Sequence, residues 1–167
     1  KRIDKKMESD SDGVDLIEAE EESVKDAVRD REASLARALE EMRQRKRKLV
    51  DPLQYALSIE SEDLANYAPT FAWEMEPPTK KQLQMLEKRG IFSDSIENQG
   101  MASLIINRLI RRQEEGLSTP KQIRCLEKYG FSHVGTWSFE NASGMISRLA
   151  ANGWSIPLGM IPMAYVP

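Results

Sequence analysis

The chain has 167 residues, 31% of which are charged, and its formal net charge at pH 7 is −3. One cysteine, Cys125, and one histidine, His133, exclude an internal disulfide and a zinc site built from cysteine and histidine. No apolar run approaches the roughly 20 residues that a membrane-spanning helix needs. We therefore expect a reduced, cytoplasmic setting without membrane or metal and, because the first residue is lysine, a piece of a longer chain.

Residues 1–14 have almost nothing to bury, which predicts a disordered segment or linker. Residues 15–50 contain neither Pro nor Gly and are rich in Ala, Glu, Arg and Leu, which predicts a long charged helix. Val28 and Leu35 are seven residues apart, but Arg31 lies between them where a coiled coil needs an apolar residue. A helix lying against another domain, or a solvated strut, is therefore favoured over a dimeric coiled coil.

Residues 51–78 predict a short helix followed by a connector. Asp51 is a suitable N-cap, and Pro52 suits the first helical position. The aromatic residues of the connector could stack on bases, but no basic residue lies nearby, so packing against a core or an interface is favoured. The aromatic residues and prolines of this connector are Tyr67, Phe71, Trp73, Pro69, Pro77 and Pro78.

Residues 79–109 recur without a gap as residues 119–149, and 12 of the 31 paired positions are identical. Such a repeat indicates one supersecondary unit used twice. The two copies extend over residues 79–113 and 119–153. One small unit buries little on its own, so we expect both copies to stack into a single core.

Each copy has the pattern of an αα-hairpin. A Thr, with a Gln three residues later, forms a capping box; an apolar stripe follows; a Gly ends the first helix, and a second helix follows a loop. These residues are Thr79, Gln82 and Gly90 in the first copy and Thr119, Gln122 and Gly130 in the second. The Pro-rich tail, residues 155–167, is expected to pack back or to be disordered. The prediction is all-α: a long N-terminal helix followed by a small helical bundle.

The N-terminal part of the chain and the tandem repeat differ in net charge. Residues 1–78 carry 13 Lys and Arg against 20 Asp and Glu, whereas residues 79–154 carry 11 against 7. A net charge of about +4 on the tandem fits a nucleic-acid surface, although a solvated helical surface explains it equally well.

Basic side chains on the tandem are the candidate binding residues. Lys121, Arg124 and Lys128 share one stripe that begins near a helix N-terminus, where cations and free N–H groups are typical phosphate ligands. Trp137 could stack on a base, but packing within its hairpin is favoured. The candidate set is Lys81, Lys88, Arg108, Arg111, Arg112, Lys121, Arg124, Lys128, Trp137 and Arg148. The alternative is a solvated or protein-facing surface.

No catalytic residue is predicted. The sequence contains no phosphate-binding glycine loop, no metal-ligand spacing and no nucleophile with a base partner. Cys125 falls on the apolar stripe of the second copy and is expected to be a packing residue.

Five runs are distinctive: Asp51-Pro-Leu-Gln-Tyr-Ala-Leu-Ser58, Pro69-Thr-Phe-Ala-Trp-Glu74, Pro78-Thr-Lys-Lys-Gln-Leu83, Ser118-Thr-Pro-Lys-Gln-Ile-Arg124 and Ala150-Ala-Asn-Gly-Trp154. In them the chain resembles the C-terminal accessory region of DEAD/DEAH-box superfamily 2 helicases of bacteria, phages and mobile elements. The resemblance covers roughly residues 45–157. It implies that the ATP and Mg²⁺ sites lie in two upstream RecA-like domains, so no cofactor is expected in this chain.

The leading hypothesis is a non-catalytic nucleic-acid-binding module that contacts the DNA backbone through basic helix faces and assists an ATP-dependent helicase. The alternative is a protein-interaction module that docks onto the helicase core domains or onto a partner protein.

Overall fold

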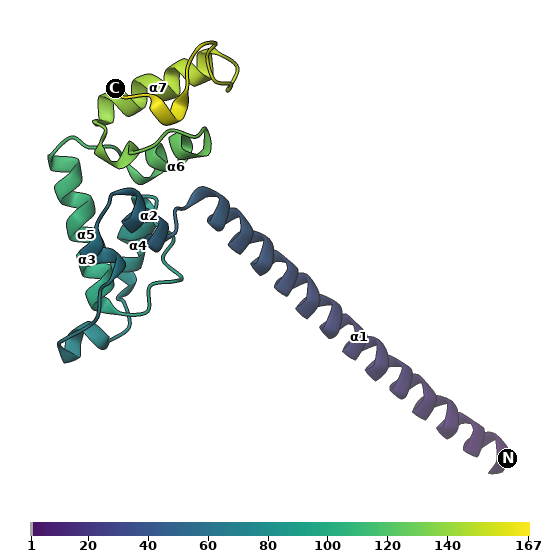
Figure 1. The fold of residues 1–167 in the computed structure, drawn as a ribbon. Helices are drawn as coiled ribbons and strands as arrows, with labels where there is room; N and C mark the ends of the chain where they lie inside the picture. Colours follow the sequence, from purple (N-terminus) through teal and green to yellow (C-terminus); the bar gives the residue numbers. More distant parts are fainter. Residues whose placement is uncertain (1) are drawn as a thin grey trace. The chain divides into compact units, whose positions relative to one another are not determined.

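The computed structural model describes the backbone of residues 2–167 and the side chains of residues 13–167. Within these residues the chain forms helices and no β-strand, with two isolated β-bridges, Val50 with Ile91 and Leu117 with Ser138. The predicted all-α fold is confirmed (Figure 1).

The chain divides into two units, residues 1–44 and residues 45–167. The first unit is formed by helix α1, Arg2–Lys48, whose last turn belongs to the second unit. We predicted a linker over residues 1–14. The side chains of most of that range lie outside the described residues, and the helical backbone begins at Arg2.

The second unit contains the short helices predicted after residue 50 and the two hairpins. In chain order its elements are α2 (Pro52–Ser58), α3 (Glu62–Ala65), the 3₁₀ helix η1 (Ala72–Met75), α4 (Lys80–Lys88), α5 (Gln99–Glu114), α6 (Pro120–Lys128), η2 (Val134–Thr136), α7 (Phe139–Ala151) and η3 (Pro162–Ala164).

Both hairpins begin with the predicted capping box. The Thr79 hydroxyl accepts a hydrogen bond from the Gln82 amide at 3.2 Å, and the Gln82 side chain accepts from the Thr79 amide at 3.0 Å. Thr119 and Gln122 form the same two bonds at the same distances. These bonds satisfy N–H groups that the first turn of a helix leaves free.

The first helix of each hairpin ends at the predicted glycine. Gly90 has φ +95° and Gly130 has φ +90°, a left-handed conformation that strains any residue with a Cβ. The amide of the next residue, Ile91 or Phe131, donates to the carbonyl five residues earlier, at 2.9 and 3.2 Å respectively. This is a Schellman closure, and it turns the chain into the loop between the helices.

A glutamine also joins the two helices of each hairpin. Gln82 Nε2 donates to Ser103 Oγ at 2.9 Å, and Gln122 Nε2 donates to Ser143 Oγ at the same distance. The capping role of both glutamines was predicted, whereas this second bond joins residues 21 positions apart and was not.

We expect Gln122→Ala to lower the free energy of unfolding by about 1–2 kcal/mol, because it removes one half of a capping box and the donor to Ser143. Chemical denaturation followed by circular dichroism measures this change. The matched control is Gln84→Ala on α4, where the side chain is exposed and a change below about 0.5 kcal/mol is expected. Equal losses in the two variants would contradict the proposed role.

One hydrophobic core joins the hairpins with α2 and α3. α4 packs on α5, α6 packs on α7, and both α3 and η1 pack on α5. The core therefore differs from the predicted stack of four helices, because side chains from α2 and α3 also enter it. Its most deeply buried large side chains are Tyr55, Leu64, Leu86, Ile91, Ile105, Ile123, Leu126 and Leu149.

The loop of the second hairpin approaches α2 through its backbone. A Cβ at Gly135 would lie 2.3 Å from the carbonyl oxygen of Ser58, so only glycine fits there. Gly100 has a similar role at the start of α5, where a Cβ would lie 1.8 Å from the hydroxyl of Tyr67.

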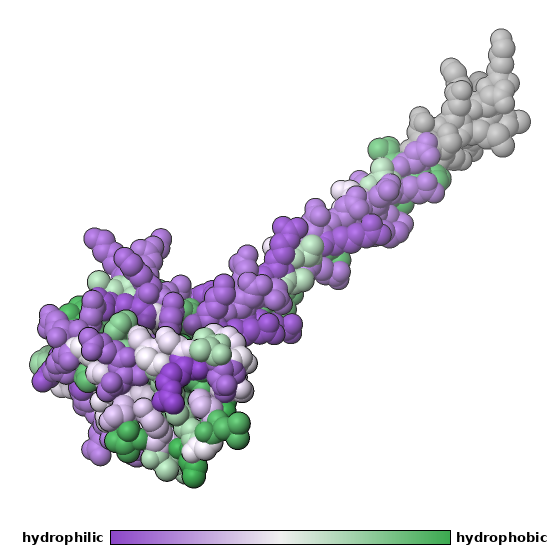
Figure 2. Space-filling view, turned by 90° about the horizontal axis from the view of Figure 1, so that it is seen from above, coloured by the Kyte–Doolittle hydropathy of each residue, from purple (hydrophilic) through white to green (hydrophobic). Residues whose placement is uncertain are grey.

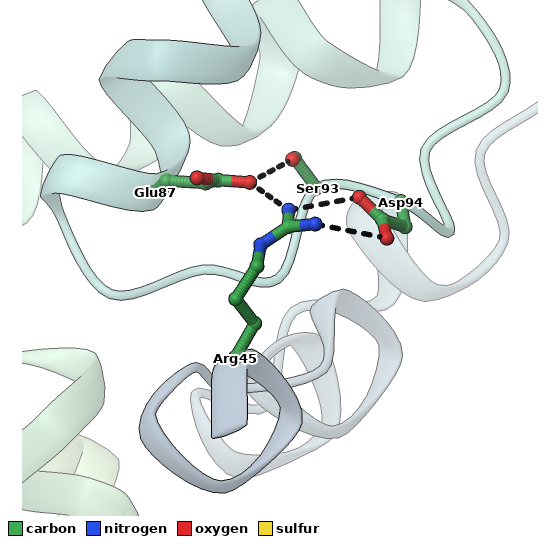
Figure 3. Close-up of polar contacts among 4 residues, drawn as sticks. All are labelled: Arg45, Glu87, Ser93 and Asp94. Atoms are coloured by element: carbon green, nitrogen blue, oxygen red, sulfur yellow. Dashed lines mark hydrogen bonds and ion pairs between the residues drawn. The ribbon is translucent and has the colours of Figure 1, made fainter. Parts of the chain in front are cut away.

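Arg45 fixes the last turn of α1 to the first hairpin. Its guanidinium donates to both carboxylate oxygens of Asp94, at 2.9 and 3.2 Å, and pairs with Glu87, which also accepts from Ser93 at 2.8 Å (Figure 3). The hydrogen bond to Asp94 raises the pKa of Arg45 above its ordinary value. Val50 adds two backbone hydrogen bonds of 2.7 Å to the loop after α4.

Two aromatic residues of the connector, Phe71 and Trp73, are largely exposed. Phe71 is 62% exposed and Trp73 is 49% exposed, so neither lies in the core of this chain, and the predicted alternative, packing at an interface, stays a prediction. η1 is a single short turn, which can direct only some of its side chains towards α5. In the tail, Tyr165 packs back on the second hairpin, whereas Trp154, which immediately precedes the tail, is 54% exposed.

Candidate anion-binding pocket between the hairpins

A pocket of about 510 Å³ lies between the two hairpins. Its wall is formed largely by the end of α4, the second half of α5 and the N-terminus of α6. The lining residues are Tyr55, Lys88, Arg89, Leu109, Arg112, Gln113, Leu117, Ser118, Thr119, Pro120, Lys121 and Phe139.

Cations from both repeats meet in this pocket. Lys88 and Arg89 lie at the end of α4, and Lys121 lies in the first turn of α6. The Lys121 side chain passes close to Gly90, where a Cβ would lie 3.0 Å from Lys121 Cγ. Arg89 Nη1 donates to Gln113 Oε1 at 2.7 Å, which holds it against α5. Two residues predicted separately as phosphate ligands, Lys88 and Lys121, therefore share one pocket.

The N-terminus of α6 adds a partial positive charge to the wall. The sequence predicted that free N–H groups here would contact phosphate. In the structure the Gln122 amide donates to the Thr119 hydroxyl, and Pro120 has no N–H. α6 therefore contributes its dipole and the Lys121 ammonium more than a set of free N–H groups.

Arg112 is a structural residue of the pocket wall and not the surface ligand that we predicted. It is 8% exposed, and its Nη2 donates to the Gly135 carbonyl at 2.7 Å and the Ser118 carbonyl at 3.2 Å. These bonds tie α5 to the linker between the repeats and to the loop of the second hairpin.

Two buried polar atoms of the wall have no hydrogen-bond partner within the described residues: the Tyr55 hydroxyl and Arg112 Nε. Burial raises the pKa of the Tyr55 hydroxyl, and the nearby charge of Arg112 opposes that increase. Burial lowers the pKa of Arg112, but an arginine stays charged at neutral pH. Because the lining residues include no Asp or Glu, the pocket favours an anion.

Two other predicted arginines on α5 are paired within the chain. Arg108 forms an ion pair with Asp63 at 2.6 Å, and Arg111 forms one with Glu115 at 3.1 Å. Both pairs are at least partly exposed, so each adds little stability, and a phosphate would have to compete with the carboxylate.

Arg124 on α6 is exposed, and its Nη1 donates to the Leu49 carbonyl at 2.5 Å. This bond ties the second hairpin to the residue that follows α1. The remaining predicted cations are exposed and lie outside the pocket: Lys81, Lys128 and Arg148.

Trp137 belongs to the core of the second hairpin. It is 3% exposed, and its ring lies 5.6 Å from the Phe131 ring in an edge-to-face arrangement. The favoured interpretation of this residue, packing within the hairpin, is confirmed, and its use as a base-stacking group is contradicted because the ring is covered.

Sequence reasoning missed Arg89 and Tyr55. Arg89 aligns with Tyr129 of the second copy, so a comparison of cations shared by both copies does not select it. Its position next to Lys88 in the sequence could have identified it. Tyr55 lies in α2, outside the repeat, and nothing in its local pattern places it beside Arg112.

The pocket offers electrostatic binding. Within the described residues there is no group of three or more His, Cys, Asp or Glu that could hold a metal ion. Cys125 is half-buried on α6, and burial raises the pKa of its thiol, which disfavours the reactive thiolate.

None of the described helices combines the length and the apolar character needed to cross a bilayer. No family model, curated protein or solved structure matches this chain. The all-α fold is thus shown by the structure itself, and the resemblance to helicase accessory regions stays a prediction.

Proposed function

We propose that residues 45–167 form a non-catalytic nucleic-acid-binding module that holds backbone phosphate in the pocket between its hairpins. Following the resemblance noted above, the module would act in the cytoplasm as an accessory part of an ATP-dependent DNA helicase. The observation that supports binding most directly is the meeting of Lys88, Arg89 and Lys121 at the N-terminus of α6 in a pocket without carboxylates.

The geometry suits a nucleic-acid backbone in a further respect. Further exposed cations lie on α4, α6 and α7 outside the pocket, and a polyanion can contact several cationic groups at once. Contacts of this kind carry no sequence information, so we expect weak sequence preference.

Charge reversal at the pocket tests the proposal. We expect Lys88→Glu combined with Lys121→Glu to weaken binding of a fluorescent DNA oligonucleotide by about tenfold or more at low salt. The slope of log K against log salt should fall by about two, one unit for each lost phosphate contact. Fluorescence anisotropy over a series of salt concentrations measures both quantities.

The matched control is Lys48→Glu combined with Lys80→Glu, which makes the same change of net charge at two exposed lysines outside the pocket. This control should lose much less affinity. Absence of DNA binding by the unmodified chain at low salt, or equal losses in both double variants, would overturn the proposal.

A second candidate function is docking onto the helicase core domains or another protein. The observation that favours it is the exposure of Phe71, Trp73 and Met75 around η1. Binding of this kind would be insensitive to salt and would be lost in Trp73→Ala, whereas DNA binding through the pocket would be unchanged in that variant.

A further inference from the structure

The described part of α1 carries an exposed apolar seam with heptad spacing. Between residues 14 and 42 its members alternate at intervals of three and four residues, which are the a and d positions of a coiled coil. Figure 2 shows separate hydrophobic side chains along an otherwise hydrophilic helix. The apolar seam residues are Val14, Val28, Leu35 and Met42 at a and Ile17, Val24 and Ala38 at d, and all seven are exposed.

Two charged residues interrupt this seam: Glu21 at an a position and Arg31 at a d position. Arg31 is the residue that made a dimeric coiled coil the less favoured prediction from the sequence, where Glu21 was not considered. In a parallel pair of α1 helices, a faces a and d faces d. Glu21 would then face Glu21 of the second copy, and Arg31 would face Arg31. Like charges buried in such a seam are strongly unfavourable.

In an antiparallel pair, a positions face d positions, so the two charges can face each other. The register that places Glu21 opposite Arg31 of the second copy also places Val24 opposite Val28. The same register pairs Ile17 with Leu35 and Val14 with Ala38, and at the end of the seam the position of Met42 faces that of Asp10. A shift by one heptad in either direction would set both charges against apolar residues.

We propose that α1 pairs with α1 of a second copy of this chain as an antiparallel coiled coil, in which Glu21 of each copy faces Arg31 of the other. Because the pairing is twofold symmetric, each of the residue pairs named above occurs twice in the dimer, including the pair of Glu21 and Arg31. A polar pair in a seam is a known means of fixing register and orientation. This inference is independent of the proposed nucleic-acid binding, and it would place two binding modules in one particle.

Charges beside the seam do not reverse this preference. In the antiparallel register Lys25 approaches Lys25 of the second copy, and Glu18 approaches Glu32 of the second copy, so these edge pairs repel, whereas in a parallel pair Glu20 would approach Lys25 of the second copy. These positions lie at the solvent-facing edge, where a pair of charges is worth about 1 kcal/mol or less. Glu21 and Arg31 lie in the seam and have the larger effect.

Sedimentation equilibrium of the full chain over a wide range of concentration tests the pairing. We expect a monomer–dimer equilibrium in the unmodified chain. Glu21→Arg should raise the dimer dissociation constant by about a hundredfold, on the order of tenfold for each of two symmetric layers. Combining Glu21→Arg with Arg31→Glu should restore association, because opposite charges face each other again.

The matched control is Glu22→Arg, which makes the same charge change on the adjacent residue outside the seam and should leave the dissociation constant nearly unchanged. Circular dichroism checks that each variant keeps its helix content.

A chain that stays monomeric at every concentration would overturn the inference. The inference would also be overturned if the Glu21→Arg variant dimerised as the unmodified chain does. That result is expected of a parallel pair, where the change only replaces a contact between two glutamates by one between two arginines. The Lys88→Glu and Lys121→Glu double variant should still dimerise, which separates this test from that of DNA binding.

Discussion

Arg112→Met is expected to lower the free energy of unfolding by about 3 kcal/mol, because it leaves buried carbonyl groups without their donor. The guanidinium bridges Gly135 in the loop of the second hairpin and Ser118 in the linker between the repeats. Ser118 in turn donates its hydroxyl to the Val134 carbonyl at 2.7 Å. Urea denaturation followed by tryptophan fluorescence measures the loss, since Trp137 lies buried close to these groups.

Arg111→Met is the control for this prediction. It removes the neighbouring arginine, which is exposed and pairs with Glu115 one helical turn away, so we expect a change below about 0.5 kcal/mol. Arg112→Lys should fall between the two, because lysine keeps the charge but not the planar fork that reaches two acceptors. If Arg112→Met and Arg111→Met unfold at the same urea concentration, the structural role assigned to Arg112 is wrong.

Trp137→Ala is expected to lower the free energy of unfolding by about 3–5 kcal/mol, because it opens a cavity at a fully packed position. The indole packs against Phe131 and lies 5.6 Å from the Tyr165 ring, so its removal should also release the C-terminal tail. Thermal denaturation measures the stability. Limited proteolysis should then cut the tail faster than it does in the unmodified chain.

Trp154→Ala provides a comparison with the same change in side-chain size. Trp154 is 54% exposed, and we expect its replacement to change stability by less than about 0.5 kcal/mol. If Trp137→Ala instead remained as stable as Trp154→Ala and lost DNA affinity, the base-stacking role would have to be reinstated.

The local features of the hairpins could be predicted from the sequence. Capping boxes and left-handed glycines involve residues only a few positions apart. Each pattern occurs in both copies of the repeat: the capping boxes at Thr79 and Thr119, and the glycines at Gly90 and Gly130. The bond from Gln122 to Ser143 was missed although both residues recur in each copy, because its formation depends on how the two helices face each other.

The arginines of α5 show why the candidate site was harder to predict. Arg108, Arg111 and Arg112 lie within one and a half turns, and residue type alone suggested one shared function. The structure gives them three different environments: an ion pair with α3, a pair within α5, and burial against the second hairpin. Side-chain chemistry is the same in all three cases, so only their direction around the helix and the neighbouring elements distinguish them.

The sequence by itself determined the helical class, the repeat and the ends of its helices, because propensity, capping and left-handed glycines act within a few residues of the chain. It also identified Lys88 and Lys121 as cations on the tandem. Only the tertiary structure decided that they line one pocket, that Arg112 and Trp137 are buried, and that α2 contributes to the core. Those outcomes depend on packing between segments distant along the chain, and no local pattern records which faces will meet.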